Sequence, residues 1–286
     1  MPRNSCAACL HLCLGYIRAC LRAALAEQKR EKVKGSKNVT IEKKEIGNFE
    51  NLEIEDNIDI LLIKSDKCSL EIEADDNLHS EININSNGNT LRLTTSKDVG
   101  GFKKFLVKVF YNNDFKLLLA KHESVVTATS EIVLDNFTIK TFDYSKVYMN
   151  GSVKTFTIMQ NDKSKSELNL KSEMATIELS KNAQLKALIA STQLKVDLYQ
   201  KSSAVIEGDV SELKLRVDNS SEFIGMNLIT KNAELIAEAN TTTKINVVTN
   251  ATIEASGKSE IQFYGDAKIE LKKFTENTII MKKTLK

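Results

Sequence analysis

The sequence predicts an all-β fold, a parallel β-helix or β-solenoid with about 19 residues per coil. Three observations support this. Apolar and polar residues alternate with a period of two from Val39 onward, a repeat begins at Phe137, and the 286 residues include 11 glycines and one proline, Pro2. Such alternation is typical of strands with one buried face. Because parallel crossovers are right-handed by default, we expect right-handed winding.

The overall composition excludes two classes of protein. The chain has 40 Lys and Arg against 38 Asp and Glu, a net charge of +2. That field is too weak to indicate a nucleic-acid-binding protein, so we expect no nucleic-acid partner. The hydrophobic fraction of 42% and the charged fraction of 27% are ordinary for a folded domain, which argues against wholesale disorder.

Residues 1–36 form a basic, cysteine-rich segment that differs from the rest of the chain. Seven basic and two acidic residues give it a charge of +5, which leaves −3 for the remainder. Arg18 and Arg22 interrupt its apolar run, so a transmembrane helix is excluded and a secretory signal would be degenerate. A degenerate export signal and a non-native leader from an upstream start codon both fit. A short amphipathic helix is predicted from the spacing of Leu10, Leu14, Ile17, Leu21 and Leu25.

The cysteines of this segment do not predict a metal site. Zinc sites usually pair two ligand clusters across a loop, whereas the only nearby histidine is His11. The clustered cysteines are Cys6, Cys9, Cys13 and Cys20. Cys68 is the only cysteine after residue 36, so no disulfide is expected within the body of the chain. We therefore expect neither a metal nor a cofactor.

Residues 37–136 are expected to form the N-terminal β part of one domain. Short alternating runs are separated by clusters of Asn, Asp, Ser, Lys and Gly, which favour turns. Because these runs are less regular than the later repeat, they predict wider coils or a capping layer. The clearest runs are 53–55, 70–74, 82–85, 91–93 and 107–109.

Residues 137–286 are expected to form a regular solenoid of seven coils. Equivalent residues recur at intervals of 19, 19, 19, 19, 20 and 18. One column contains Phe137, Phe156, Ala175, Leu194, Leu213, Ala233 and Ala251. The next contains Ile139, Ile158, Ile177, Val196, Leu215, Leu235 and Ile253. Strand patterning at this period is typical of stacked coils.

The columns also predict the interior and the corners of the coil. The Ile, Val and Leu column should form a dry interior ladder, because parallel strands stack about 4.8 Å apart. A column of small residues should mark a tight corner, where a hydroxyl can bond a free backbone group. This column contains Ser145, Ser164, Ala183, Ser202, Ser221, Thr241 and Ser259.

Several segments resemble the head GIN domain family, a Bacteroidetes-type bacterial family described as auto-transporter adhesin heads. The resemblance covers residues 40–286. Family members open with a "G-F-x-x-I-x-V" strand, and an "I-E-A-D-x-N-L" strand follows. The matching segments are Gly47–Ile54, Leu70–Leu78, Gly88–Leu93, Val107–Tyr111 and Ser256–Gly265.

The resemblance implies an exported, non-enzymatic solenoid and carries over no catalytic residue. The sequence departs from the family pattern at the corners, where Asn, Lys, Asp and Thr replace most glycines. Asn and Asp tolerate left-handed corners, so the fold should be retained. The lack of a clear export signal bears on localisation, which we expect to be extracellular, cell-surface or periplasmic.

One outward column raises the alternative of a polysaccharide-acting β-helix enzyme. Glu178, Asp197 and Arg216 should be consecutive neighbours about 4.8 Å apart, so they could form paired carboxylates with a basic partner. The competing interpretation is a surface charge ladder compensated by Lys195 and Lys214. Because the Asp cluster that would bind Ca²⁺ is missing, we expect no enzyme. His79 and His122 show no evident Asp or Ser partner in the sequence.

Outward aromatic residues support a ligand-binding interpretation. Phe142 and Tyr199 share a column three coils apart, and Tyr144 and Tyr148 project from the first regular coil. Aromatic rings at such spacing could stack on sugars or peptides, so a glycan or an extracellular protein is the expected partner. Single exposed aromatic residues are also normal on protein surfaces.

The ends of the stack require protection from edge pairing. Lys272, Lys273, Lys282 and Lys283 flank the apolar residues near the C-terminus and are consistent with charge that discourages such pairing. Self-association at the solenoid ends is the alternative. Three functions therefore stay open: an adhesin or ligand-binding scaffold, which we favour, a polysaccharide-acting enzyme, and a purely structural cell-envelope protein.

Overall fold

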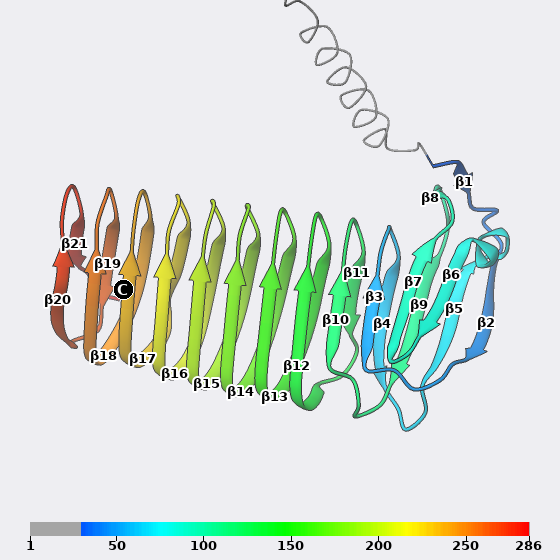
Figure 1. Ribbon diagram of the computed structural model, residues 1–286, viewed down its shortest axis with the longest axis horizontal. Helices are drawn as coiled ribbons and strands as arrows, with labels where there is room; N and C mark the ends of the chain where they lie inside the picture. Colours follow the sequence, from blue (N-terminus) through cyan, green and yellow to red (C-terminus); the bar gives the residue numbers. More distant parts are fainter. Residues whose placement is uncertain (1–29, 286) are drawn as a thin grey trace, which may run out of the picture.

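The computed structural model describes residues 30–285 and shows a nearly all-β solenoid of about nine turns with about 19 residues per turn (Figure 1). The predicted all-β solenoid is therefore confirmed, whereas its handedness stays a prediction. The proposed leader helix and the four clustered cysteines lie outside the described residues. The regular strands are β12 (Ile132–Thr141), β13 (Lys146–Gln160), β14 (Lys165–Leu179), β15 (Gln184–Leu198), β16 (Ser203–Val217), β17 (Glu222–Ala237), β18 (Thr242–Ala255), β19 (Glu260–Tyr264), β20 (Lys268–Phe274) and β21 (Ile279–Lys282).

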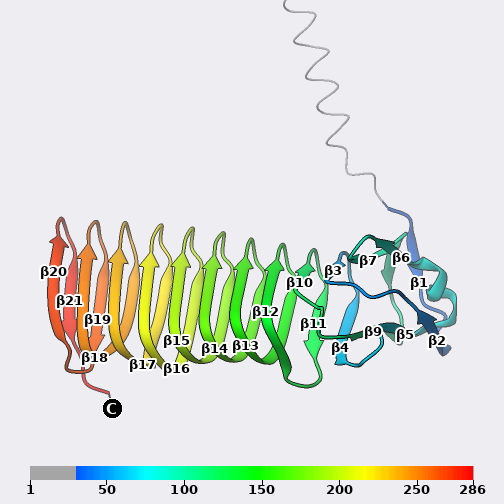
Figure 2. The ribbon, with the colours of Figure 1, turned by 60° about the horizontal axis from the view of Figure 1, so that its bottom comes forward.

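Each long strand contributes to both faces of the flattened solenoid (Figure 2). The end of one strand pairs on the first face, which contains residues 137–141 and their equivalents in other coils. After a tight turn, the beginning of the next strand pairs on the second face, which contains residues 146–151 and their equivalents. All pairings along the regular array are parallel, so the apolar columns meet between the two faces.

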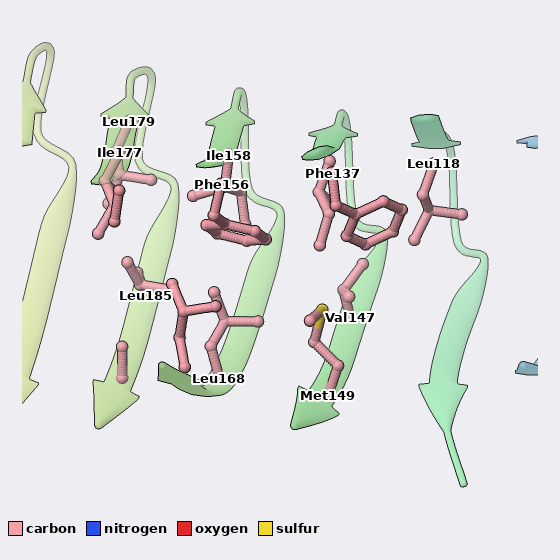
Figure 3. Close-up of a cluster of buried hydrophobic side chains, with 14 of the residues drawn as sticks. Leu118, Phe137, Val147, Met149, Phe156, Ile158, Leu168, Ile177, Leu179 and Leu185 are labelled. Carbon is pink, nitrogen blue, oxygen red and sulfur yellow. The ribbon is translucent and has the colours of Figure 1, made fainter. Parts of the chain in front are cut away.

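The interior column follows the predicted register residue by residue. Ile139, Ile158 and Ile177 are direct neighbours on successive strands, and all three are fully buried. Figure 3 shows Ile158 and Ile177 among the inward side chains that pack between the faces. The rings of Phe137 and Phe156 lie 6.4 Å apart, which extends the stack with an aromatic contact. Full burial of each such side chain stabilises the fold by roughly 1.5–3 kcal/mol relative to exposure.

The intervals of 20 and 18 residues are absorbed by irregularities in strand pairing. The register shifts between Val205 and Gly208 and again between Gly225 and Ile229. Gly208 has a φ of 117°, and a Cβ there would lie 2.1 Å from the Ile189 carbonyl oxygen. Only glycine fits this close approach, so the bulge depends on that residue.

The tight turns confirm the predicted role of the small-residue column. Asp143 and Asp162 adopt left-handed φ values of 60° and 61°, as Asp can at such corners. Two residues later, the hydroxyls of Ser145 and Ser164 each donate to the carbonyl oxygen three residues earlier at 2.8 Å. Both serines are buried, because the column faces the interior at the end of each turn.

The stack extends further toward the N-terminus than the repeat indicated. β3 (Asn51–Ile54) and β4 (Asp59–Lys64) pair in parallel with β10 (Leu117–Ala120) and β11 (Val125–Ala128), which in turn pair with β12 and β13. Residues 51–64 and 117–128 are therefore two further coils. Residues 65–116 lie between these adjacent coils in sequence and form the cap.

The cap closes the N-terminal end together with the segment that precedes the first coil. The cap contains β5 (Ser69–Asp75), η1 (Asp76–Glu81), β6 (Ile82–Asn87), β7 (Thr90–Thr95), β8 (Asp98–Gly100) and β9 (Phe105–Tyr111), and the preceding segment contributes β1 (Lys32–Lys34) and β2 (Val39–Glu45). β7 and β9 pair in parallel with β3 and β4, the pairs β6–β7, β5–β9 and β2–β5 are antiparallel, and β1 pairs in parallel with β8. The short 3₁₀ helix η1 contacts β2, β5 and β6, and its Leu78 is fully buried. Among residues 30–285, no helix has the length and hydropathy needed to cross a membrane.

Asp75 ties the cap to the segment that precedes it. Its buried carboxylate accepts the backbone N–H of Lys37 at 2.9 Å and those of Lys103 and Lys104 at 3.1 Å. Burial opposes ionisation, but the three donated N–H groups outweigh it and lower the pKa of Asp75. The charged carboxylate therefore holds two loops together.

Removal of one interior rung should destabilise the array. Ile177→Ala is expected to lower the free energy of unfolding by about 2–5 kcal/mol, because Ile177 is fully buried and leaves a cavity. Ile229→Ala is the matched control, since Ile229 is 48% exposed and should change the free energy by at most about 0.5 kcal/mol. Urea denaturation followed by circular dichroism measures both. Equal shifts in midpoint for the two variants would contradict the interior assignment of Ile177.

Loss of the Asp75 charge should make the stability of the folded protein less sensitive to a fall in pH. A lowered folded-state pKa adds stability above the unfolded pKa of about 4, and that stability disappears as pH falls further. Asp75→Asn should therefore melt at a lower temperature than the parent at pH 7, and the difference should shrink below about pH 4. Asp135→Asn removes a carboxylate that is 72% exposed and serves as the control. A constant difference in melting temperature across pH would refute the assignment.

Candidate functional site

The structure distributes the seven predicted ligand-facing residues over three places. Phe142, Tyr144 and Tyr199 lie at the tight-turn edge, Tyr148 lies on the second face, and the three charged residues lie on the first face. The charged residues are Glu178, Asp197 and Arg216. The predicted residues therefore do not form one continuous site.

The three charged residues are direct neighbours on successive strands, but Asp197 and Arg216 form ion pairs with other side chains. Glu178 is the register partner of Asp197, which is the register partner of Arg216. Asp197 Oδ2 pairs with Lys195 Nζ at 2.7 Å on the same strand, and this hydrogen bond raises the pKa of Lys195. Arg216 Nη2 pairs with Glu238 Oε2 at 2.9 Å. The geometry is that of a surface charge ladder.

The aromatic residues at the tight-turn edge contact basic side chains. The Tyr144 side chain is exposed, and Lys163 Nζ lies 3.1 Å from its hydroxyl and 5.1 Å from its ring centroid. The Arg216 guanidinium lies 5.7 Å from the ring of half-buried Tyr199. Both are cation–π contacts within this chain. Phe142 and Tyr199 occupy equivalent positions three coils apart, a separation of roughly 14 Å.

Tyr144 also borders a polar hollow of about 600 Å³ beside the cap. Asp56 lines it and accepts hydrogen bonds from Arg30 at 2.6 Å and from the Thr95 backbone N–H at 3.0 Å. Burial opposes ionisation of Asp56, but these bonds outweigh it and lower its pKa. His122 Nδ1 accepts the Asp56 N–H at 3.3 Å. Several of the polar groups that line the hollow are thus paired with one another.

The proximity of His122 to Asp56 escapes sequence reasoning. The two residues are 66 positions apart, and the capping insertion lies between them. Their contact depends on the stacking of the coils that contain them, residues 51–64 and 117–128. The available signal of their proximity is that Asp56 and His122 occupy equivalent positions in the tight turns of their two coils. Both adopt left-handed φ values there, 71° and 57°.

Tyr148 borders a groove of about 540 Å³ on the second face. The groove lies between two outward rows of side chains, and its floor is the strand backbone at Met149, Leu168 and Ala187, whose side chains point inward and are buried. Its apolar surface comes from outward residues, chiefly Leu188, which is 50% exposed, and half-buried Val205. The remaining lining residues are Thr127, Ala128, Asn150, Glu167, Asn169, Lys186 and Glu207.

The groove combines one aromatic side chain with a polar rim. Tyr148, Glu167 and Lys186 are consecutive register neighbours, and Asn150 and Asn169 form a second outward row beside them. An aromatic ring, two amides and a pair of opposite charges therefore line the groove together with the outward apolar side chain of Leu188. We refer to this groove, with the lining residues given above, as the second-face groove. The sequence placed Tyr148 at the surface but not the recess beside it.

Metal chemistry has no candidate site in residues 30–285. This part of the chain contains no group of three or more His, Cys, Asp or Glu side chains that could hold a metal ion. Cys68 is buried and unpaired.

Comparisons with known proteins support the same architecture. A family model described as "Putative auto-transporter adhesin, head GIN domain" matches residues 48–267. A "putative adhesin" structure from Parabacteroides merdae is 18% identical with a TM-score of 0.64, covering 90% of this chain and 100% of the other. A comparison with curated proteins finds no match.

Two structures from Parabacteroides distasonis share the fold as well. One, described as a "putative lipid binding protein", is 16% identical with a TM-score of 0.62 and covers 88% of this chain and 99% of its own. The other, a "putative adhesin", is 20% identical with a TM-score of 0.59, over 87% of this chain and 99% of its own. These identities support the fold, and the family model spans well over half of the sequence. The chain belongs to the head GIN domain family.

Proposed function

We propose that this protein is a non-enzymatic adhesin or ligand-binding scaffold that acts at the cell surface, outside the cell or in the periplasm. The description of its family and of two structural neighbours as adhesins supports this role. The observation that carries the proposal is the second-face groove, where Tyr148 and the outward apolar side chains of Leu188 and Val205 lie beside polar and charged groups. Self-association would involve an end of the stack, away from this groove.

The rim of the second-face groove favours a glycan as the ligand. A sugar presents an apolar ring face together with hydroxyls that both donate and accept. Tyr148 offers an aromatic surface, and Asn150 and Asn169 offer amide donors and acceptors. Glu167 and Lys186 add a charged acceptor and a charged donor. An extracellular protein that presents an aromatic or amide-rich loop is the alternative partner.

The backbone that frames the groove is fixed by strand pairing, which favours ligand binding at an open, shallow site. Its residues lie on β13, β14, β15 and β16, whose backbones pair with one another in register. Side chains fixed by strand pairing lose little conformational entropy when a ligand binds. A chain of several sugars could contact successive coils, since equivalent positions recur about every 4.8 Å.

A lipid is the second candidate, because one structural neighbour is described as a "putative lipid binding protein". An acyl chain could lie along the outward side chains of Leu188 and Val205 beside Tyr148. The charged and amide-bearing rim gives less support to this ligand, since burying Glu167 or Lys186 against an acyl chain would cost free energy. A glycan leaves these groups hydrated or hydrogen-bonded.

The binding proposal is tested by truncation of the Tyr148 ring. A glycan array identifies the oligosaccharide bound most tightly, and calorimetry measures its affinity. Tyr148→Ala should weaken that affinity by roughly tenfold, because stacking on an aromatic ring contributes about 1–1.5 kcal/mol. Tyr144→Ala is the matched control, since Tyr144 borders the polar hollow beside the cap. Binding of no sugar, or equal loss in both variants, would contradict the proposal.

The enzymatic alternative makes the opposite prediction about Glu178. Because Asp197 is engaged by Lys195 and Arg216 by Glu238, we expect purified protein to release no unsaturated or reducing ends from uronate polymers. Reducing-sugar and absorbance assays measure both products. Turnover that disappears in Glu178→Ala but persists in Glu254→Ala, a change in the same outward column, would overturn the non-enzymatic assignment.

A further inference from the structure

The C-terminal end of the array exposes interior positions. Ile269, Leu271 and Phe274 of β20 continue the inward columns, as the register partners of Ala251, Ile253 and Ala255. Their exposed fractions are 39%, 50% and 46%, whereas their register partners on β18 are buried. β20 pairs with β18 on one side, and its other edge forms the end of the array in Figure 1.

The two ends of the solenoid differ in this respect. At the N-terminal end, η1 contacts the outer strands of both faces and buries Leu78. At the C-terminal end, Figure 2 shows the last described residues running below the array rather than across it. An exposed strand edge with apolar inward residues tends to pair with another strand.

We propose that the C-terminal end pairs with the C-terminal end of a second copy, so that two solenoids join head to head. The two-fold axis would run perpendicular to both faces, and β20 would pair antiparallel with β20 of the second copy. The interface is then isologous and closed, which gives a dimer and not a filament. The capped N-terminal end offers no matching surface for a head-to-tail stack.

The β20 sequence is self-complementary in one register. The pairing of β20 with β18 shifts after Ile253, so Lys272 forms a bulge, and Lys272 and Lys273 together occupy one outward position. With Leu271 opposite Leu271 of the second copy, Glu270 lies opposite this lysine pair. Ile269 then lies opposite Phe274. Apolar residues thus meet apolar residues, and each acid meets bases.

The same axis gives a consistent pairing on the second face. A tight turn at Thr275–Thr278 joins the two faces. Leu271 is the second inward residue before this turn, after Phe274, and Ile280 is the second inward residue when the count starts at Thr278. An axis through Leu271 therefore also passes through Ile280. β21 then pairs with β21 of the second copy so that Ile279 lies opposite Met281. Ile279 is 53% exposed at an outward position and would gain an apolar neighbour in Met281 of the second copy.

The end lysines select this register. Registers centred on Glu270 or on Lys273 would place like charges opposite each other, which is unfavourable. A strand edge from another protein would need an acid at the position opposite Lys272 and Lys273. Lys282 is already engaged on its own chain, with Asp266 Oδ1 at 2.9 Å and the Phe263 ring at 5.8 Å. The charges thus discourage other pairings and permit this one.

The oligomeric state of the full chain tests this inference. Light scattering after size exclusion should give twice the chain mass of 31.9 kDa, with dissociation on dilution. Leu271→Asp should give a monomer, because it places two carboxylates opposite each other. Leu188→Asp is the matched control, since Leu188 is also 50% exposed but lies on the second face, and it should stay dimeric.

A charge exchange separates specific pairing from general stickiness. Glu270→Lys should give a monomer with an unchanged circular dichroism spectrum, and Lys272→Glu with Lys273→Glu in the same chain should restore the dimer. A parent protein that is monomeric at its highest soluble concentration would overturn the inference. So would a dimer that survives Leu271→Asp, or a charge exchange that fails to restore it. None of these results bears on Tyr148, so the glycan proposal would stand or fall separately.

Discussion

In-register parallel pairing between coils is the constraint on which the rest of this structure depends. Within the regular array, the strand backbone of each coil pairs with the coils before and after it. A coil can therefore differ from its neighbours in length only where a bulge absorbs the difference, as at Gly208. Because pairing fixes which residues lie above one another, the interior becomes a set of ladders such as Ile139, Ile158 and Ile177.

The same constraint explains the unusual composition. A tight turn recurs once per coil and is held on both sides by its neighbours, so it can tolerate residues that are strained in isolation. Asp143, Asp162, Lys181 and Gln200 all adopt left-handed φ values at this corner. The buried serine two residues after Asp143 or Asp162 donates back to the start of the turn. Stacking therefore replaces the glycines and prolines that other folds use to turn.

The regular array could be predicted from the sequence almost completely. Columns read at 19-residue intervals correspond to strand partners in the structure, including those across the slips at Ala233 and Ala251. This works because each coil contacts its neighbours in the same way, so a local period reports on three-dimensional contacts. The two coils at 51–64 and 117–128 were not recognised, because a long insertion separates them and hides their period.

The candidate sites were less accessible to sequence reasoning. The outward position of Tyr148 follows from alternation, but the recess beside it depends on how the outward side chains of several coils are arranged in space. The contact between Asp56 and His122 depends on the stacking of two coils that the capping insertion separates in sequence, so no period reveals it. Adjacent register of Glu178, Asp197 and Arg216 was predictable, whereas the choice of Lys195 and Glu238 as ion-pair partners was not.

The insertion of the cap between two adjacent coils has a consequence for synthesis. The capping strands and the first coil are complete once residue 111 has emerged, so a finished template exists early in translation or export. Each later segment of about 19 residues can then add to an edge that is already formed, with contacts made only to the coil before it. The chain can thus fold progressively from its N-terminus while little more than one coil remains unstructured.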